Sequence, residues 1–378
     1  MSLSLSERMR RVPRGLLGAV AIVAVVESYI TSHDVKFSRL EPDDWRYTAR
    51  AASRDLPSGG VLFFGDSQVK FGFSPLAIEA RLGQPSQSLA IQGGQAPSSY
   101  FLLRKALATG VMPSAIVVDF EPHLLRDVLQ ESSRMWAELA DLGECFELAR
   151  ASRDASAFAA MALGRCLPSY LQRLEVRDNI KAALRGEVRP MTPLMEMAQR
   201  NRGMNRGSLV IAKNPALLRH DIGHWANPTP EPWAPSPINE VYVRKFLALA
   251  RSRNIPVYCA LMPVDPGLQV KFERGGMERH YFGWLRGLQD AFPNLYVLDW
   301  RRSNYQPSAF MDAMHLNAEG VASASAALGD YLRRSFKGDG VLVRWVRMPD
   351  FRLDGTEVAV EDSSQSDMIM RSSAYRRR

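Results

Sequence analysis

Short apolar runs alternate with longer amphipathic segments through most of the chain. The runs that predict strands buried on both faces are Val61–Gly65, Ser88–Ile91, Ala115–Phe120, 256–262 and 295–299. The amphipathic segments that predict helices between them lie near 74–82, 97–108, 239–253, 277–291 and 317–334. Strands separated by helices of this length favour an α/β fold, with a parallel sheet and helices on both faces.

The pattern changes between residues 123 and 235, where segments near 134–163 and 170–185 are helical in character and are followed by a proline-rich stretch. We interpret this region as a helical insertion between strands, so that one α/β domain covers residues 60–336. From residue 337 onward we expect a C-terminal extension with a strand pair at Val341–Val346 and Glu357–Val360 and a disordered polar end.

The N-terminal region predicts a membrane segment. Arginines at positions 8, 10, 11 and 14 precede twelve apolar residues, Gly15–Val26, and the apolar character extends with one interruption to Ile30. A span needs about 20 residues, so this segment is marginal, and it also fits a signal peptide. No small-x-small cleavage site follows, which favours an uncleaved anchor over residues 1–31 and a polar stalk over 32–59. A buried amphipathic helix is the alternative.

The charge pattern bears on location and partners. The chain has 378 residues, 46% of them hydrophobic, and a net charge of +8 that comes partly from arginines at both ends. Basic residues that precede an anchor stay in the cytoplasm, which predicts an extracytoplasmic body. No basic stripe with interleaved aromatic residues is present, so nucleic acid is not an expected partner. Cys145 and Cys166 could pair in an oxidising compartment, and Cys259 is expected to be buried.

Two short motifs carry the candidate chemistry. Gly65-Asp66-Ser67-Gln68 follows the first predicted strand, and Asp312-Ala313-Met314-His315 precedes the last predicted helix. A serine hydroxyl is a weak nucleophile unless a base removes its proton, and the carboxyl ends of parallel strands open into a crevice. We therefore predict that Ser67 is a nucleophile, that His315 is its base, and that Asp312 orients the imidazole.

Each motif also has a purely structural interpretation. Gly-Asp-Ser is common in turns, and an Asp-x-x-His segment before a helix can serve as a cap. Two further features have weaker functional interpretations. His220 and His224 have a spacing that metal ligands use, but Gly223 and nearby prolines disfavour a helix there, so no metal is expected. Trp225 and Trp233 could stack on sugar rings or serve as packing anchors.

Taken together, the motifs that contain Ser67 and His315 resemble the conserved sequence blocks of the SGNH (GDSL-like) hydrolase superfamily. The resemblance is strongest to its membrane-anchored bacterial branch, which is similar to the O-acetyltransfer proteins of exopolysaccharide and cell-wall modification. Gly65-Asp66-Ser67 matches the nucleophile block, Ile91-Gln92-Gly93-Gly94-Gln95 matches the second block, and Asp312-x-x-His315 matches the last block. The third block of the family is not matched, because the corresponding segment, Glu121-Pro122-His123, lacks the asparagine that often donates to the oxyanion.

The resemblance implies a flavodoxin-like three-layer α/β/α sandwich and an oxyanion hole formed by the amides of Ser67 and of Gly93 or Gly94. Gln68, Gln95 and Glu121 are expected to line the pocket, and Gln95 could replace the absent asparagine. No cofactor is implied. The expected function is acyl transfer, with acetyl as the expected group, or ester hydrolysis on an envelope polysaccharide.

Water as the acceptor gives an esterase, and a sugar hydroxyl gives a transferase. The expected partners are an acylated polysaccharide or an acyl donor, and other membrane proteins of an envelope polysaccharide assembly. The expected location is the bacterial inner membrane, with a single span and a periplasmic domain. A different class also fits the sequence, namely a degenerate SGNH fold that binds polysaccharide or serves as a scaffold.

Overall fold

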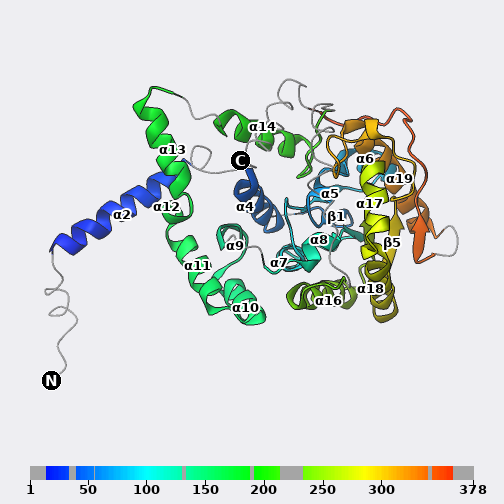
Figure 1. Cartoon of the computed structure of the whole chain (residues 1–378), viewed down its shortest axis with the longest axis horizontal. Helices are drawn as coiled ribbons and strands as arrows, with labels where there is room; N and C mark the ends of the chain where they lie inside the picture. Colours follow the sequence, from blue (N-terminus) through cyan, green and yellow to red (C-terminus); the bar gives the residue numbers. More distant parts are fainter. Residues whose placement is uncertain are drawn as a thin grey trace.

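A six-stranded parallel sheet forms the centre of the protein (Figure 1). The computed structural model describes residues 14–33, 40–54, 56–129, 133–187, 191–212, 233–338 and 343–360. The strand order is β2-β1-β3-β4-β5-β6. The strands are β1 (Val61–Phe64), β2 (Ser86–Ser88), β3 (Ala115–Val118), β4 (Val257–Leu261), β5 (Leu295–Asp299) and β6 (Trp345–Arg347). The predicted α/β fold with a parallel sheet is confirmed, and the order of the first five strands is that of flavodoxin-like folds.

The strand order reverses direction between β1 and β3, which lie side by side with Phe63 paired to Val117. From β1 the chain first crosses to β2 on one side and then continues to β3 on the other. Ligands of open α/β sheets bind in the crevice outside the carboxyl ends of the strands at such a switch point. The segments that follow β1 and β3 are therefore the places to look for a site.

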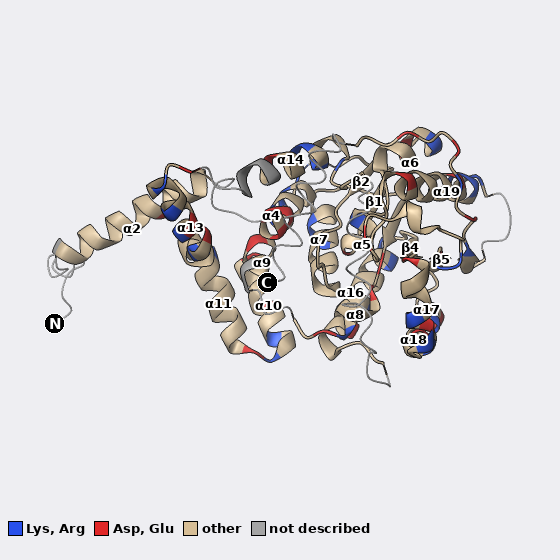
Figure 2. Cartoon of the chain, turned by 45° about the horizontal axis from the view of Figure 1, so that its top comes forward, with Lys and Arg blue, Asp and Glu red and all other residues tan. Residues whose placement is uncertain are grey.

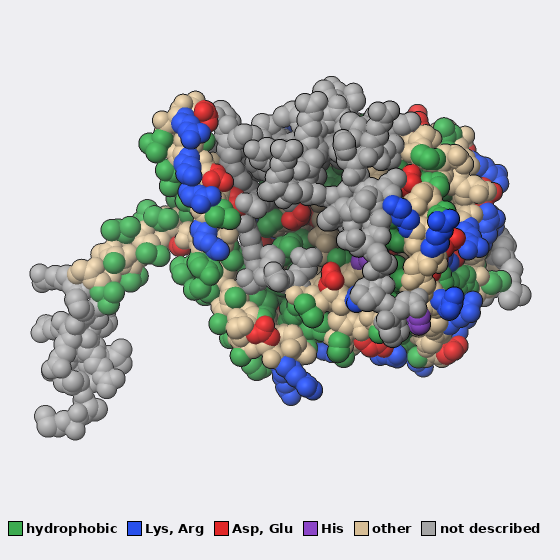
Figure 3. Space-filling view, viewed as in Figure 1, with side chains coloured by type: hydrophobic (Ala, Val, Ile, Leu, Met, Phe, Trp, Pro, Cys, Tyr) green, Lys and Arg blue, Asp and Glu red, His purple; other side chains and the backbone are tan. Residues whose placement is uncertain are grey.

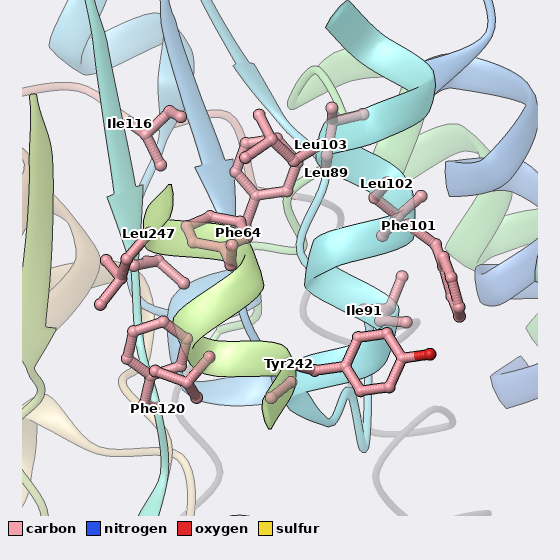
Figure 4. Packing of buried hydrophobic residues seen from close by; sticks show 14 of the residues in the cluster. Phe64, Leu89, Ile91, Phe101, Leu102, Leu103, Ile116, Phe120, Tyr242 and Leu247 are labelled. Atoms are coloured by element: carbon pink, nitrogen blue, oxygen red, sulfur yellow. The ribbon is translucent and has the colours of Figure 1, made fainter. Parts of the chain in front are cut away.

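Alternate residues of the strands point to two separate cores. On one face Leu62, Phe64 and Ile116 pack against residues of α7 and α16, such as Phe101 and Leu247 (Figure 4). On the other face the neighbouring strand residues, which include Val61, Phe63 and Val117, pack against α6 and α19. Burial of both faces explains why the strands are continuous apolar runs instead of alternating apolar and polar positions.

The helices fall into three groups. Those that flank the sheet are α5 (Ser67–Lys70), α6 (Pro75–Leu82), α7 (Ala96–Ala108), α16 (Pro237–Ser252), α17 (Pro266–Arg274), α18 (Met277–Ala291) and α19 (Ala318–Lys337), with a 3₁₀ turn η1 (Pro307–Ala309). Those of the insertion are α8 (Pro122–Arg126), α9 (Ser133–Leu139), α10 (Leu142–Ser152), α11 (Ala155–Cys166), α12 (Pro168–Leu171), α13 (Arg173–Leu184) and α14 (Met191–Met204). The N-terminal pair is α2 (Arg14–Ser32) and α4 (Leu40–Ala52).

Local capping chemistry determines where several helices begin. Ser74 caps α6, and its hydroxyl accepts a hydrogen bond from the amide of Ala77 at 3.3 Å. Asn317 caps α19 by accepting from the amides of Glu319 and Gly320. Some predicted boundaries were wrong, because the second strand covers 86–88 instead of 88–91.

The C-terminal extension is partly built into the sheet. Strand β6 pairs in parallel with β5, so the expected strand near 341–346 joins the main sheet instead of forming a pair with 357–360. Residues 357–360 are not a strand. The polar end that we expected to be disordered, residues 361–378, lies outside the described residues.

Helix α2 projects away from the body and carries apolar side chains around its surface (Figure 3). Among the described residues, Gly15–Ser32 is the one segment long and apolar enough to cross a membrane, with a mean hydropathy of 1.7. Where α2 meets the body, Glu27 accepts a hydrogen bond from the amide of Ser169 in α12 at 2.8 Å. The length and apolar composition of α2 fit a signal sequence as well as a membrane-spanning helix.

The prediction of a polar stalk over 32–59 was wrong for residues 40–54. Residues 40–52 form helix α4, which packs against α7 and α9. The side chains of Asp44 and Trp45 are fully buried, and Trp45 packs edge-on against Trp136 with ring centroids 5.0 Å apart. Helix α4 is therefore part of the α/β domain and not a spacer.

The region between β3 and β4 contains helices α8 to α14, as the sequence predicted. Trp233 is buried, donates from its indole nitrogen to the carbonyl oxygen of Pro122 at 2.9 Å, and packs on Tyr281, so it is a packing anchor. Trp225, His220 and His224 lie outside the described residues. Cys145 is buried, Cys166 is exposed, and neither forms a disulfide bond.

Candidate active site

Ser67 lies where the chain turns from β1 into α5. Gly65 adopts a positive φ of 117°, and Asp66 caps α5 by accepting a hydrogen bond from the amide of Gln68 at 2.6 Å. This turn makes Ser67 the first residue of a short helix at the carboxyl end of the sheet. The Gly-Asp-Ser motif therefore has a structural role in the turn, and it also places the hydroxyl at the strand-order switch point.

A hydrogen-bonded chain joins the three predicted residues. The Oγ of Ser67 lies 2.8 Å from Nε2 of His315, although 248 positions separate them in the sequence. The other ring nitrogen of His315, Nδ1, lies 2.8 Å from Oδ2 of Asp312. Nucleophile, base and orienting carboxylate thus have the connectivity of a Ser-His-Asp triad. In this arrangement Nε2 can accept the serine proton while Nδ1 donates to the carboxylate.

The loop that carries Asp312 and His315 is closed by backbone contacts. Phe310 and Leu316 form an isolated antiparallel bridge, and the amide of Met311 donates to the carbonyl oxygen of His315 at 3.0 Å. Phe71 packs edge-on against the imidazole, with ring centroids 5.2 Å apart. These contacts restrict the imidazole to the orientation that faces Ser67.

Asp312 is held in its charged form. Burial by itself would raise the pKa of this carboxyl group, but the His315 imidazole and the amides of Met314 and His315 outweigh burial and hold the pKa below its ordinary value. Both amides donate to Oδ1 at 2.8 Å. A carboxylate that stays ionised can stabilise an imidazolium after His315 takes up a proton.

The amides expected to form the oxyanion hole differ in their availability. Gly94 donates its amide to the carbonyl oxygen of Ile91 at 3.1 Å, within a turn. Within the part of the chain that the structure describes, the amides of Ser67 and Gly93 have no acceptor. Of the two glycines, Gly93 is therefore the better candidate to donate with Ser67.

Gln95 has a structural role instead of a catalytic one. Its side-chain amide donates to the carbonyl oxygens of Val128 at 3.0 Å and Leu124 at 3.4 Å, and the residue is buried. Both of its N–H groups are therefore used to hold the segment after β3. The idea that Gln95 replaces the missing asparagine as an oxyanion donor finds no support in these contacts.

A small cleft of about 50 Å³ opens at the carboxyl ends of β3 and β4, next to Gln68, the residue after Ser67. Gln68 and Glu121 line it, as predicted, together with Met262 and Phe272. Gln95 and Glu121 also line a smaller neighbouring pocket. One water molecule needs a cavity of roughly 10–15 Å³, so this cleft has room for only a few heavy atoms.

Asp119 lies directly after β3 and packs against the nucleophile turn. Its Oδ1 accepts a hydrogen bond from the amide of Asp66 at 2.8 Å. A Cβ atom built on Gly65 would lie 1.6 Å from the same oxygen. Glycine is therefore required at position 65 both by its backbone conformation and by the close approach of Asp119.

Replacement of Gly65 by alanine should lower the free energy of unfolding by about 3 kcal/mol, because a left-handed backbone and an overpacked core each contribute roughly 1–2 kcal/mol. Gly83 is a matched control, since it has a φ of 73° and no atom within 4 Å of a built Cβ. In urea unfolding, Gly83→Ala should lower the free energy of unfolding only by the contribution of the left-handed backbone. Equal losses in the two variants would contradict the close packing of Asp119 on Gly65.

The carboxyl group of Asp119 is buried. Burial first, and then the neighbouring charge of Asp66, raise the pKa of Asp119 well above its ordinary value. The folded state therefore binds a proton at this carboxyl group more tightly than the unfolded state, in which the group titrates at about pH 4. By linkage, this group's contribution to stability is present below that pH and is lost as the pH rises through the folded pKa.

Replacement of Asp119 by asparagine should remove this pH dependence, because the amide keeps the shape and cannot ionise. We expect the free energy of unfolding of Asp119→Asn to decline less than that of the wild type between pH 5 and pH 8, measured by urea unfolding. The exposed Asp290→Asn variant serves as the control and should follow the wild type. Parallel pH curves for wild type and Asp119→Asn would contradict the assignment of a buried proton to Asp119.

The structure contains a buried charge network next to the site that the sequence analysis did not predict. Asp44 in α4 accepts from the Nζ of Lys70 in α5 at 2.6 Å and from the backbone amide of Gln92 at 3.0 Å. Arg202 in α14 pairs with the same carboxylate at 3.2 Å and also with Asp43. Asp44 thereby joins α5, the helix that begins with Ser67, to the loop that carries Gly93, and it positions both.

Within the described residues, no group of three or more His, Cys, Asp and Glu side chains is arranged to hold a metal ion.

Fold and site together describe an α/β protein with a Ser-His-Asp hydrogen-bond chain at its strand-order switch point. Residues 59–322 match a protein family described as "Protein of unknown function (DUF1574)". The match covers more than half of the chain, so the protein belongs to this family. It includes Ser67, Gly93, Asp312 and His315 but not α4. A search among curated proteins gave no match.

Proposed function

We propose that this protein is a serine-dependent acyltransferase or esterase that acts through Ser67, His315 and Asp312. The observation that carries the proposal is the continuous hydrogen-bond chain from Ser67 Oγ through His315 to Asp312, with two links of 2.8 Å. Residues from opposite ends of the domain meet there in the geometry that nucleophilic catalysis needs. The resemblance of the sequence blocks to SGNH hydrolases points to the same chemistry.

The proposed reaction has two halves. His315 removes the proton from Ser67 as the hydroxyl attacks the acyl carbonyl, and the amides of Ser67 and Gly93 stabilise the oxyanion. Collapse of this intermediate expels the leaving alcohol, which takes the proton from His315 and leaves an acyl-enzyme. The acceptor then attacks with His315 as base. Water releases the free acid, whereas a sugar hydroxyl gives a new ester.

The small cleft next to Gln68 supports a short acyl group, and acetyl is the simplest candidate. An export anchor at α2, preceded by arginines, supports an extracytoplasmic domain that acts on an envelope polysaccharide. The intact hydrogen-bond chain favours an enzyme over the degenerate scaffold, because a fold that has lost catalysis has no need to keep both links.

The test is turnover of an activated acetyl ester, such as p-nitrophenyl acetate, by the full-length protein in an uncharged detergent. Wild-type protein should release p-nitrophenol at a rate that Ser67→Ala does not support. Addition of an oligosaccharide acceptor would then separate transfer from hydrolysis by the appearance of an acetylated sugar. Equal rates for the wild type and Ser67→Ala would overturn the proposal.

A further inference from the structure

A second cavity, of about 470 Å³, lies beside α4 and is separate from the residues of the triad and the cleft. Among its lining residues four arginines face one carboxylate, Asp43. The arginines are Arg46, Arg50, Arg54 and Arg202. Helices α4 and α14, which supply three of them, pack against each other (Figures 1 and 2). This concentration of positive charge around a cavity has no role in the proposed acyl transfer.

The spacing of the α4 arginines places them on one side of the helix. Arg46 and Arg50 are four residues apart, and Arg54 follows just beyond the end of α4 at Ala52. Side chains four residues apart on a helix are neighbours, and like charges in this relation destabilise it. Arg46 lies 3.7 Å from both Asp43 and Glu138. Within the described residues, Arg54 has no carboxylate partner. Arg50 and Arg54 are exposed, so their guanidinium groups are accessible from solvent.

Arg202 forms the rigid wall of the cavity. Its side chain is buried, is held by Asp43 and Asp44, and lies over the ring of Tyr47 at 4.7 Å. Its Nε has no hydrogen-bond partner among the described residues. Because both terminal nitrogens of Arg202 are bound to carboxylates, the groups that can meet a ligand in this cavity are the exposed Arg50 and Arg54. The planar fork of arginine matches the oxygens of a phosphate in pairs, which lysine does not do.

We propose that this cavity binds a phosphate-bearing anion with at least two negative charges. Several guanidinium groups around one cavity favour a ligand with adjacent charged groups, such as a diphosphate, over a single small anion. Arg46 and Arg50 also line a neighbouring cavity that reaches Thr31 at the end of α2. The anion is therefore either a lipid headgroup from the membrane or a soluble phosphate compound, since both present the same chemistry.

The first experiment measures binding of inorganic pyrophosphate to the full-length protein in uncharged detergent by calorimetry at constant ionic strength. We expect saturable binding that weakens at least about tenfold in the Arg50→Gln/Arg54→Gln double variant, because each substitution removes charge-assisted hydrogen bonds to the phosphate oxygens. The control is Arg251→Gln/Arg253→Gln, which removes two charges from an exposed helix end elsewhere. The control should bind like the wild type.

The second arm separates the two sources in nanodiscs. If a lipid headgroup is the natural occupant, phosphatidylglycerol nanodiscs should weaken pyrophosphate binding relative to phosphatidylcholine nanodiscs. If the natural occupant is a soluble phosphate compound, the affinity for pyrophosphate should be the same in both kinds of nanodisc. Absence of saturable binding, or equal weakening in the two arginine double variants, would overturn the proposal. Because the readout is binding, its result is independent of whether Ser67 is a nucleophile.

Discussion

Replacement of Ser67 or His315 by alanine should lower kcat for an activated acetyl ester by at least about 10³-fold, and the double variant should lose no more than either single variant. Residues that act as one unit in a triad are grossly non-additive, because removal of either one already abolishes the activated nucleophile. The 2.8 Å contact between Ser67 Oγ and His315 Nε2 is the structural reason to expect such coupling. Steady-state kinetics of the four proteins measures it.

Ser252→Ala is a suitable control, because Ser252 is exposed on α16 and its hydroxyl donates only to the carbonyl oxygen of Leu249. This variant should keep wild-type kcat. If the losses of Ser67→Ala and His315→Ala multiply in the double variant, the two side chains act independently. That outcome would contradict a shared proton-transfer step.

Replacement of Asp44 by alanine should lower the free energy of unfolding by about 3–5 kcal/mol, the loss expected when one partner of a buried ion pair is removed. The carboxylate is fully buried and pairs with Lys70 and Arg202, so its removal leaves two buried cations without their shared partner. It also frees the backbone amide of Gln92 next to Gly93. Urea unfolding monitored by tryptophan fluorescence measures the loss, and kcat should fall with it.

Asp290→Ala is the control for this prediction, because Asp290 is exposed on α18 and should change stability by less than about 0.5 kcal/mol. The free energy of unfolding of Asp44→Asn should lie between those of the wild type and Asp44→Ala. The asparagine amide can still accept a hydrogen bond from Gln92, but it carries no charge. A loss below 1 kcal/mol for Asp44→Ala would show that α4 does not hold the domain together as its contacts indicate.

The parts of this protein that the sequence predicted are those encoded by local patterns. The buried strands β1 and β3 appear as uninterrupted apolar runs, and Ser74 and Asn317 identify helix starts through their capping chemistry. The candidate nucleophile and base could also be predicted, because both lie in short motifs at the ends of regular elements. Parallel strands bring such ends to one edge of a sheet, which is why distant motifs could be placed together.

The parts that were missed depend on pairing between distant residues. Helix α4 contains Asp43, Asp44 and two arginines, so its composition resembles a solvated stalk. Its charged side chains are buried because their partners, Lys70 and Arg202, come from α5 and α14. An apolar stripe was nevertheless present in Leu40, Trp45, Ala49 and Ala52, which are all buried, and Trp45 in particular could have indicated a packed helix. The engagement of Gln95 by distant carbonyl groups had no signal in the sequence.

The most direct test of the central claim is to trap the acyl-enzyme. Wild-type protein would be mixed with an excess of activated acetyl ester, quenched in acid within the first turnovers, digested and analysed by peptide mass spectrometry. The account predicts that the peptide containing Ser67 gains the mass of one acetyl group, and that fragmentation places the group on Ser67. Acetylation of a different side chain during productive turnover, with Ser67 unmodified, would contradict it.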